Sequence, residues 1–429
     1  MTRLTIRGAR VLDPATGLDQ ATDIHIADGR IAALGGAAGF TPETVIDAGG
    51  LLAIPGLVDL CARLREPGAE HKADIRSEAA AAVAGGITTL VCPPDTDPVL
   101  DTPSVAELIH GRAQQAATAR VLPLGALTLG LAGEHLSEMS HLHDAGCVGF
   151  SDGGRPVAST LVLRRALEYA ASFALPVLLT PTDPWLASLG GMHEGPVATR
   201  LGLHGVPEAA ETAGLARALA VARELDTPVH FGRLSCAQGV ALLEQARRQG
   251  QSVTSDAAIH QLFLTEEDCA EFDCQAHVQP PLRGAADRDA LRRALAGGGL
   301  TALCSDHQPH DSDAKDGPFA ESAAGISGLD SLLALVLQLG REEPELGLAG
   351  ALAAVTCQPA DCLGLPCGRL SPGAPADLCL VDPDERWILD PDRMASRGRN
   401  TPFAGRKLQG RARLTLVGGR VVFCRDTSH

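Results

Sequence analysis

Short stretches in which apolar and polar residues alternate lie near both ends of the chain. They cover residues 3–12, 23–33 and 44–54 near the N-terminus and residues 377–382 and 413–423 near the C-terminus. Alternation with a period of two, broken by Gly and Asp, is typical of strands and hairpins. We therefore expect the two ends to build one small β-sandwich domain from residues 1–54 and 366–429.

The middle of the chain has a different pattern, in which continuous apolar runs alternate with Ala-rich stretches of helical character. The apolar runs are residues 88–92, 121–127, 147–151, 176–180, 228–232 and 301–305. Strands that alternate with helices predict a parallel sheet covered by those helices. The predicted fold class is therefore α/β, with a (β/α)8 TIM-like barrel over residues 55–365. In such a barrel, functional side chains lie where the strands end and the loops begin.

The amino-acid composition excludes several classes of binding partner for this protein. The 429 residues include 36 Lys and Arg against 52 Asp and Glu, and the resulting net charge of −16 argues against nucleic acid and anionic membrane surfaces. No apolar run approaches the roughly 18–20 residues of a membrane span, and the first residues lack the apolar core of an export signal. The 12 cysteines are scattered, so we expect buried thiols in a reducing cytoplasm.

Several motifs, in order along nearly the whole chain, resemble those of dihydroorotases. PGLVDLCARLREPG at residues 55–68 is similar to the family's Asp-x-His-x-His-x-Arg-x-Pro-Gly, and GFSDGGRPV at 149–157 is similar to FSDDGxPV. VHFGRLSC at 229–236 resembles VHxxHVST, and SDHQPH at 305–310 resembles TDHAPH. The chain is thus identified as a member of class I of the dihydroorotase family, in the amidohydrolase superfamily. The resemblance implies a barrel of the metal-dependent hydrolase type.

The same resemblance shows that most metal-binding positions have changed. Where matching dihydroorotases carry zinc ligands, this chain has Cys61, Arg63, Gly153, Thr180, Arg233 and Asp306. Only Asp306 is retained, and an arginine cannot bind zinc because it stays protonated and has no lone pair to donate. None of the three lysines, Lys72, Lys315 and Lys407, sits at the end of a core strand, so the carboxylated lysine of other relatives is missing too. The resemblance implies zinc, but these residues predict no metal cofactor and no catalytic residue.

The substrate-binding positions are altered as well. By resemblance, the remnants of the substrate site are Arg65, Asp95 and His310. Arg65 is retained, whereas Asp95 replaces an asparagine and so exchanges an N–H donor for an anion. Two like charges at ~4 Å repel by about 4 kcal/mol at an effective dielectric near 20, so Asp95 would oppose an anionic substrate.

The two arginines at former ligand positions predict an ion pair where the family binds its metal. Arg63 and Arg233 occupy positions where zinc would face Asp306, so we expect at least one guanidinium to pair with that carboxylate. The alternative is that both arginines turn out to solvent at the barrel mouth. His230 lies at an odd offset from Arg233, so we expect it to face the other way and to serve packing.

Three functions are compatible with this pattern. The first is a catalytically inactive dihydroorotase-like subunit of pyrimidine biosynthesis. The resemblance to non-catalytic members implies assembly with the catalytic chain of aspartate transcarbamoylase, six copies of each, and self-association. The second is an active cyclic-amide hydrolase with one metal on Asp306 and Cys61. The third, an allantoinase- or hydantoinase-like enzyme, needs the metal cluster and bridging lysine that are missing here. The first agrees best with the lost ligands.

Overall fold

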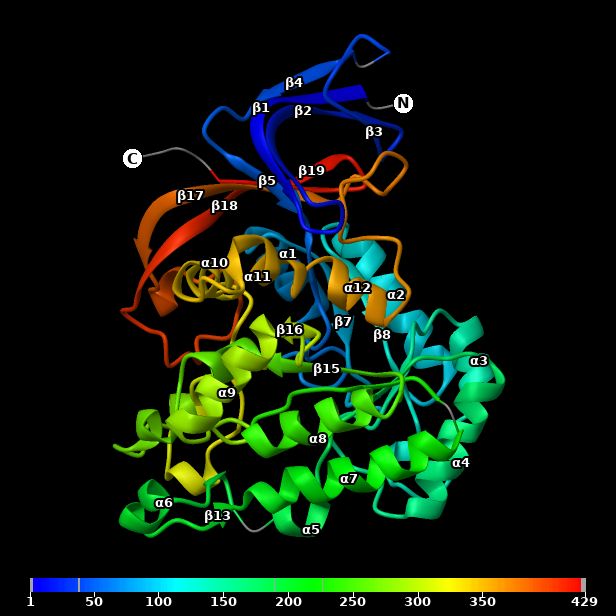
Figure 1. The fold of residues 1–429 in the computed structure, drawn as a ribbon, viewed down its shortest axis with the longest axis vertical. Coiled ribbons are helices and arrows are strands. Elements are labelled where there is room, and N and C mark those ends of the chain that lie inside the picture. Colours follow the sequence, from blue (N-terminus) through cyan, green and yellow to red (C-terminus); the bar gives the residue numbers. More distant parts are fainter. Residues whose placement is uncertain (1–2, 38, 189, 226, 426–429) are drawn as a thin grey trace.

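The computed structural model of the chain describes residues 3–37, 39–188, 190–225 and 227–425. Strands from the two ends of the chain lie together in a β domain at one end of the molecule (Figure 1). These strands are β1 (Arg3–Asp13), β2 (Leu18–Ala27), β3 (Arg30–Leu34), β4 (Thr44–Asp47), β5 (Leu52–Pro55), β17 (Leu378–Ile388), β18 (Lys407–Val417) and β19 (Arg420–Cys424). They form one eight-stranded sheet.

The β domain is therefore assembled from both ends of the chain as predicted, but its strands belong to one sheet rather than to two separate sheets. The reason is β5, which pairs with β1 in parallel and with β17 in antiparallel orientation. The predicted strand at 23–33 is divided, because Asp28 and Gly29 both adopt positive φ angles of 52° and 77° between β2 and β3. An Asp-Gly pair of this kind makes the tight turn of a hairpin.

The barrel consists of short parallel strands, in agreement with the predicted α/β fold. They are β6 (Leu57–Asp59), β7 (Ile87–Cys92), β8 (Arg120–Pro123), β9 (Gly125–Ala126), β10 (Phe150–Ser151), β11 (Val177–Leu179), β14 (Val229–Phe231), β15 (Val253–Ala258) and β16 (Ala302–Cys304). They pair in the orders β6-β7-β8 and β16-β15-β14-β11-β10-β9. The ring closes just beyond β6 and β16, where Arg63 N donates to the His307 carbonyl at 2.9 Å.

Helices follow the strands and cover the outside of the barrel (Figure 1). They are α1 (Ile75–Ala84), α2 (Pro103–Ala116), α3 (Met139–Asp144), α4 (Thr160–Ser172), α5 (Pro184–Ala187), α6 (Pro196–Leu201), α7 (Glu208–Leu225), α8 (Ala237–Arg248), α9 (Ala285–Ala296), α10 (Leu332–Glu342), α11 (Gly347–Ala353) and α12 (Cys357–Cys362). A further short pair, β12 (Met192–His193) and β13 (Gly205–Val206), lies in a loop region. No helix in the described ranges combines the length and apolarity needed to cross a membrane.

Side chains inside the barrel separate into an apolar layer and a polar layer. The interior apolar cluster includes Leu60, Val91, Leu124, Leu178 and Leu363. The polar residues predicted from the motifs follow the C-terminal ends of the strands, which is where barrels of this type carry their chemistry. The fold therefore places the candidate residues at one mouth of a filled barrel.

Candidate functional site

Two guanidinium groups meet one buried carboxylate at the mouth of the barrel. Arg63 follows β6, Arg233 follows β14 and Asp306 follows β16. The Nη1 atoms of Arg63 and Arg233 lie 3.1 and 3.4 Å from Asp306 Oδ1. Both arginines are only 8% exposed and Asp306 is 1% exposed. The predicted pairing with Asp306 is thus confirmed, for both arginines, and the alternative of solvent-facing arginines is wrong.

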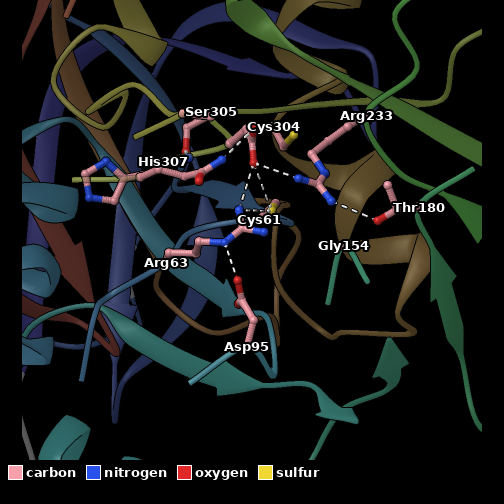
Figure 2. A network of polar contacts seen from close by, with 12 residues as sticks. Cys61, Arg63, Asp95, Gly154, Thr180, Arg233, Cys304, Ser305 and His307 are labelled. Atoms are coloured by element: carbon pink, nitrogen blue, oxygen red, sulfur yellow. Dashed lines mark hydrogen bonds and ion pairs between the residues drawn. The ribbon is translucent and has the colours of Figure 1, made fainter. Parts of the chain in front are cut away.

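Each guanidinium is also held at a second point. Arg63 Nε donates to Asp95 Oδ2 at 2.6 Å, and Arg233 Nη2 donates to Thr180 Oγ1 at 2.8 Å. Figure 2 shows this chain of contacts, which runs from Asp95 to Arg63, then through the Asp306 carboxylate to Arg233 and on to Thr180. Burial opposes the ionisation of Asp95, but the adjacent Arg63 charge lowers the pKa of its carboxyl below the usual value. The centre is therefore a network of alternating charges.

Cys61 lies against the same carboxylate. Its Sγ is 3.4 Å from Asp306 Oδ1 and 3.8 Å from Arg63 Nη1. Burial is the main reason that the pKa of the Cys61 thiol is raised, and the charge of Asp306 raises it further. A thiol in these surroundings stays protonated at neutral pH, whereas metal binding and nucleophilic attack both require the thiolate.

The fourth altered position, Gly153, offers no side chain to the centre. Its φ angle is +59°, and a Cβ built at this position would lie 2.9 Å from Leu131 Cδ1. The preceding carboxylate, Asp152, accepts hydrogen bonds from the backbone N–H groups of Thr180 at 2.9 Å and Gly154 at 3.1 Å. Asp152 is therefore engaged in holding loops together.

These residues do not fit a zinc ion. Zinc in a catalytic site takes three or four ligands from thiolate, imidazole or carboxylate groups. In the part of the chain that the structure describes, no three His, Cys, Asp or Glu side chains are grouped closely enough to hold a metal ion. The positions facing Asp306 carry cations, which repel a divalent ion. The zinc that the fold family implies therefore has no suitable donor set here.

Little space is left at this centre. The cavity lined by Cys61, Arg63, Thr180, Arg233 and Asp256 has a volume of about 30 Å³. A single water molecule takes about 30 Å³ in the liquid, whereas small-molecule sites usually measure about 300–1,000 Å³. In this conformation the cavity between these residues has room for water but is far smaller than a usual small-molecule site.

Two of the residues that the resemblance assigns to the substrate site, Arg65 and His310, contact each other. Arg65 Nε donates to the Pro309 carbonyl at 3.0 Å, and its Nη2 lies 3.1 Å from His310 Nε2. Lys72 Nζ lies 3.1 Å from His310 Nδ1, on the other side of the ring. Burial and these two cations lower the pKa of His310 to about 3. Neutral His310 and Arg65 are thus committed to loop contacts, while Asp95 is committed to Arg63.

Three site residues have left-handed backbone conformations. The φ angles are 66° at Arg65, 62° at Arg233 and 44° at Asp306. Such angles in non-glycine residues cost about 1–3 kcal/mol each and usually persist at functional sites. The backbone around Asp306 therefore has a specialised shape of the kind found at functional sites.

A buried pair beneath the centre was not predicted from the sequence. His230 Nε2 lies 2.8 Å from Asp256 Oδ2, and Asp256 Oδ1 accepts the backbone N–H of Arg233 at 2.7 Å. The expectation that His230 faces away from the site is wrong. β14 ends at Phe231, and the left-handed conformation of Arg233 breaks the alternation on which that expectation relied. The position of Asp256 on β15, two residues from Thr254 and Ala258, is the signal that would have indicated an interior carboxylate.

The histidines of the SDHQPH loop make structural contacts. His307 is fully buried, with Nε2 2.9 Å from Glu78 Oε2, and its Nδ1 accepts the Gly328 backbone N–H at 3.1 Å. Asp59 accepts the Ser305 backbone N–H at 2.9 Å, and burial raises the pKa of Asp59 to about 6. These contacts anchor the loop that carries Asp306.

Comparisons with known proteins agree with this architecture. The family model described as Dihydro-orotase-like matches residues 50–236. The chain is 50% identical to the "Dihydroorotase-like protein" of Pseudomonas aeruginosa, over 97% of this chain and 99% of the relative. It is 42% identical to the "Dihydroorotase" of Syntrophotalea carbinolica, over 98% of this chain and 99% of the relative.

The fold is also shared with solved structures. The L-hydantoinase of Arthrobacter aurescens superimposes with a TM-score of 0.87 at 24% identity, over 98% of this chain and 96% of the hydantoinase. This similarity establishes a barrel of the metal-hydrolase type with an accessory β-rich domain. Together with the sequence identities over nearly complete chains, it shows that the protein belongs to the dihydroorotase-like family of amidohydrolases.

Proposed function

We propose that this protein is a non-catalytic dihydroorotase-like subunit, which assembles with the catalytic chain of aspartate transcarbamoylase in the cytoplasm. The observation that carries the inactive part of the proposal is the pairing of Arg63 and Arg233 with Asp306. Two guanidinium groups fill the position that the zinc centre takes in the family. The charge of the retained carboxylate is thereby neutralised by the protein itself.

The chemical consequence is the loss of an activated water. Zinc lowers the pKa of bound water from 15.7 to about 7, and no other group in this centre supplies that effect. Asp306 acting alone as a general base would contribute only about 10²–10⁴-fold, and its Oδ1 is already bound by two cations. The small cavity leaves no room for a ring-shaped substrate in the described conformation.

The partner is proposed from the resemblance to non-catalytic dihydroorotase-like chains that accompany aspartate transcarbamoylase. The protein retains the barrel, the β domain and the loop anchors around Asp306, although the reaction centre is altered. Retention of the frame without the chemistry is what a subunit used for its surface requires. By the same resemblance the assembly contains six copies of each chain.

A second candidate rests on the contact between Cys61 and Asp306. Their 3.4 Å separation would allow a single metal to bind both, as an active cyclic-amide hydrolase with one metal would need. Two protein ligands are fewer than the three that a catalytic zinc site uses, and Arg63 Nη1 lies next to the same two atoms. We therefore keep this function as an outcome of the test rather than as the conclusion.

If the protein is non-catalytic, as proposed, added metal should change neither its activity nor its stability. The purified protein, with zinc or with a chelator, is expected to hydrolyse dihydroorotate no faster than buffer. Its unfolding temperature is expected to be the same in both conditions, because no metal contributes to folding. The relative from Syntrophotalea carbinolica named dihydroorotase serves as the reference enzyme. Zinc-dependent turnover that is lost in Cys61→Ser would favour the hydrolase instead.

A further inference from the structure

A large cavity lies away from the barrel mouth, between the β domain and the barrel. It measures about 720 Å³, more than twenty times the space at the Arg63–Asp306 centre. Its walls come from β17, β18 and the end of β19 on one side and from α1 and α10 on the other (Figure 1). Junctions between domains are a common place for small-molecule sites, and this volume is typical of them.

The cavity is rich in arginine although the chain as a whole is acidic. Arg386, Arg393, Arg411 and Arg425 all line it, within a chain of net charge −16. Arg411 is paired with Glu385 at 3.1 Å and lies over the Trp387 ring, 4.6 Å from its centroid. Stacking on an aromatic face and forked hydrogen bonding are the properties that suit arginine to phosphate recognition.

Two of these arginines, the exposed Arg386 and the half-buried Arg425, form no ion pair with the described residues. No carboxylate in the described part of the chain lies within ion-pair distance of Arg386 or Arg425. Arg425 donates instead to the carbonyls of Ala412 and Ala84, at 3.1 and 3.2 Å. Burial, and then the nearby Arg411 charge, lower the pKa of Arg425, and the charges of Glu385 and Asp330 offset only part of this; an added anion would counter the repulsion from Arg411.

The carboxylates that line the cavity, Asp330 and Asp390, are already bound by other groups of the protein. Asp330 accepts hydrogen bonds from the backbone N–H groups of Ala395 at 2.7 Å and Ser396 at 3.2 Å. Asp390 accepts the Asp392 N–H at 3.1 Å, and its only described ion-pair contact is Arg393, at 3.8 Å. The cationic side of the cavity is therefore open to an external anion.

The rest of the wall is apolar and aromatic. Leu333, Ala334, Trp387, Leu389 and Phe423 contribute to it. A bare inorganic anion would leave this surface unused, whereas a molecule with both a flat apolar part and phosphate groups would contact both kinds of wall. Base–aromatic stacking and arginine–phosphate pairing recur together in nucleotide recognition.

We infer that the cavity between β17–β18 and α10 is a binding site for a small organic phosphate, of the chemical class to which nucleotides belong. The phosphate groups would pair with Arg386 and Arg425, and the ring would lie against the Trp387 side of the wall. The site is separate from the altered metal centre and does not depend on the proposed partner.

The chain supplies its own reporter for this site, because it contains only two tryptophans. Trp185 is 64% exposed and stands on α5, outside the cavity, so Trp185→Phe leaves Trp387 as the single tryptophan, which can be excited selectively over Tyr169. Pyrophosphate and ADP are titrated into this variant at constant ionic strength, with adenosine as the uncharged comparison. Calorimetry on the same samples reports binding even if the indole emission stays constant.

Saturable binding of pyrophosphate is expected, with tighter binding of ADP and none of adenosine. Arg386→Ala in the same background is expected to weaken the binding of both pyrophosphate and ADP by about tenfold. This is the effect of losing one charge-assisted hydrogen bond. Arg248→Ala is the matched control, because that side chain is 69% exposed on α8, far from the cavity lining. No saturable heat or fluorescence change with either phosphate, or equal weakening by both substitutions, would overturn the proposal.

Discussion

Replacing Asp306 by alanine is expected to lower the free energy of unfolding by about 3–5 kcal/mol, because it leaves two buried guanidinium groups without their shared partner. Arg63 would keep Asp95, but Arg233 would keep only the neutral Thr180 hydroxyl. In an active zinc enzyme the same substitution would remove a ligand and unpaired cations would not arise. Urea unfolding followed by circular dichroism measures the change.

The exposed pair between Arg10 and Asp19 provides the control. These side chains are 57% and 44% exposed, and solvent screening limits such pairs to about 0–1 kcal/mol. Asp19→Ala should therefore change stability by no more than about 1 kcal/mol. If Asp306→Ala were equally mild, the ion-paired centre could not be an important part of the fold.

The second large effect is a loss of stability at alkaline pH, which originates in His230. Burial disfavours its charged form, but the hydrogen bond and charge of Asp256 outweigh burial and raise the pKa of His230 to about 10. The unfolded value is about 6.5, so the folded protein holds this proton more tightly. The stabilisation is therefore complete below about pH 6.5 and is lost as the pH rises toward 10.

The expected slope is a fall of up to about 1.4 kcal/mol per pH unit in the free energy of unfolding, since one proton is released on unfolding. The measurement compares the protein with His230→Asn between pH 7 and pH 10. Buried thiols that do not contact His230 contribute equally to both proteins, so the difference in slope reports His230 together with its neighbour Cys362. Parallel pH profiles would show that His230 is neutral in the folded state.

The barrel and the accessory domain could be predicted because their signals are periodic and repeated along the chain. Residues such as Val177–Leu179 and Ala302–Cys304 are continuous apolar runs, and each is followed by a polar residue at the barrel mouth. The single sheet of the β domain could not be predicted, because the pairing of β5 with β17 joins residues more than 300 positions apart. Periodicity identifies strands but does not identify their neighbours.

The site residues that belong to a recognisable motif could be predicted from the sequence. Several contacts between residues on different strands of the barrel could not. The motifs located Arg63, Arg233 and Asp306, and their opposite charges were enough to predict their pairing. Nothing in the sequence around Asp95 indicated that it would bind Arg63 rather than face the cavity. The pairing of His230 with Asp256 was missed because alternation was extended past the end of β14.

The strained backbone at Arg65, Arg233 and Asp306 bears on how the protein is used. Left-handed conformations at these positions cost stability, and under the proposed function they would position neither a metal nor a substrate. The ion pairs and loop anchors that surround them compensate part of that cost. Under the proposed function, these contacts would hold fixed the surface that the subunit presents to its partner.

The central claim is tested most directly by the native mass and the activity of aspartate transcarbamoylase from the same organism, measured with and without this chain. The proposal predicts one joint particle with the mass of six copies of each chain. It also predicts transcarbamoylase activity that depends on this chain, with no hydrolysis of dihydroorotate by the particle. Two proteins that elute separately, with transcarbamoylase activity unchanged by this chain, would contradict the proposed role.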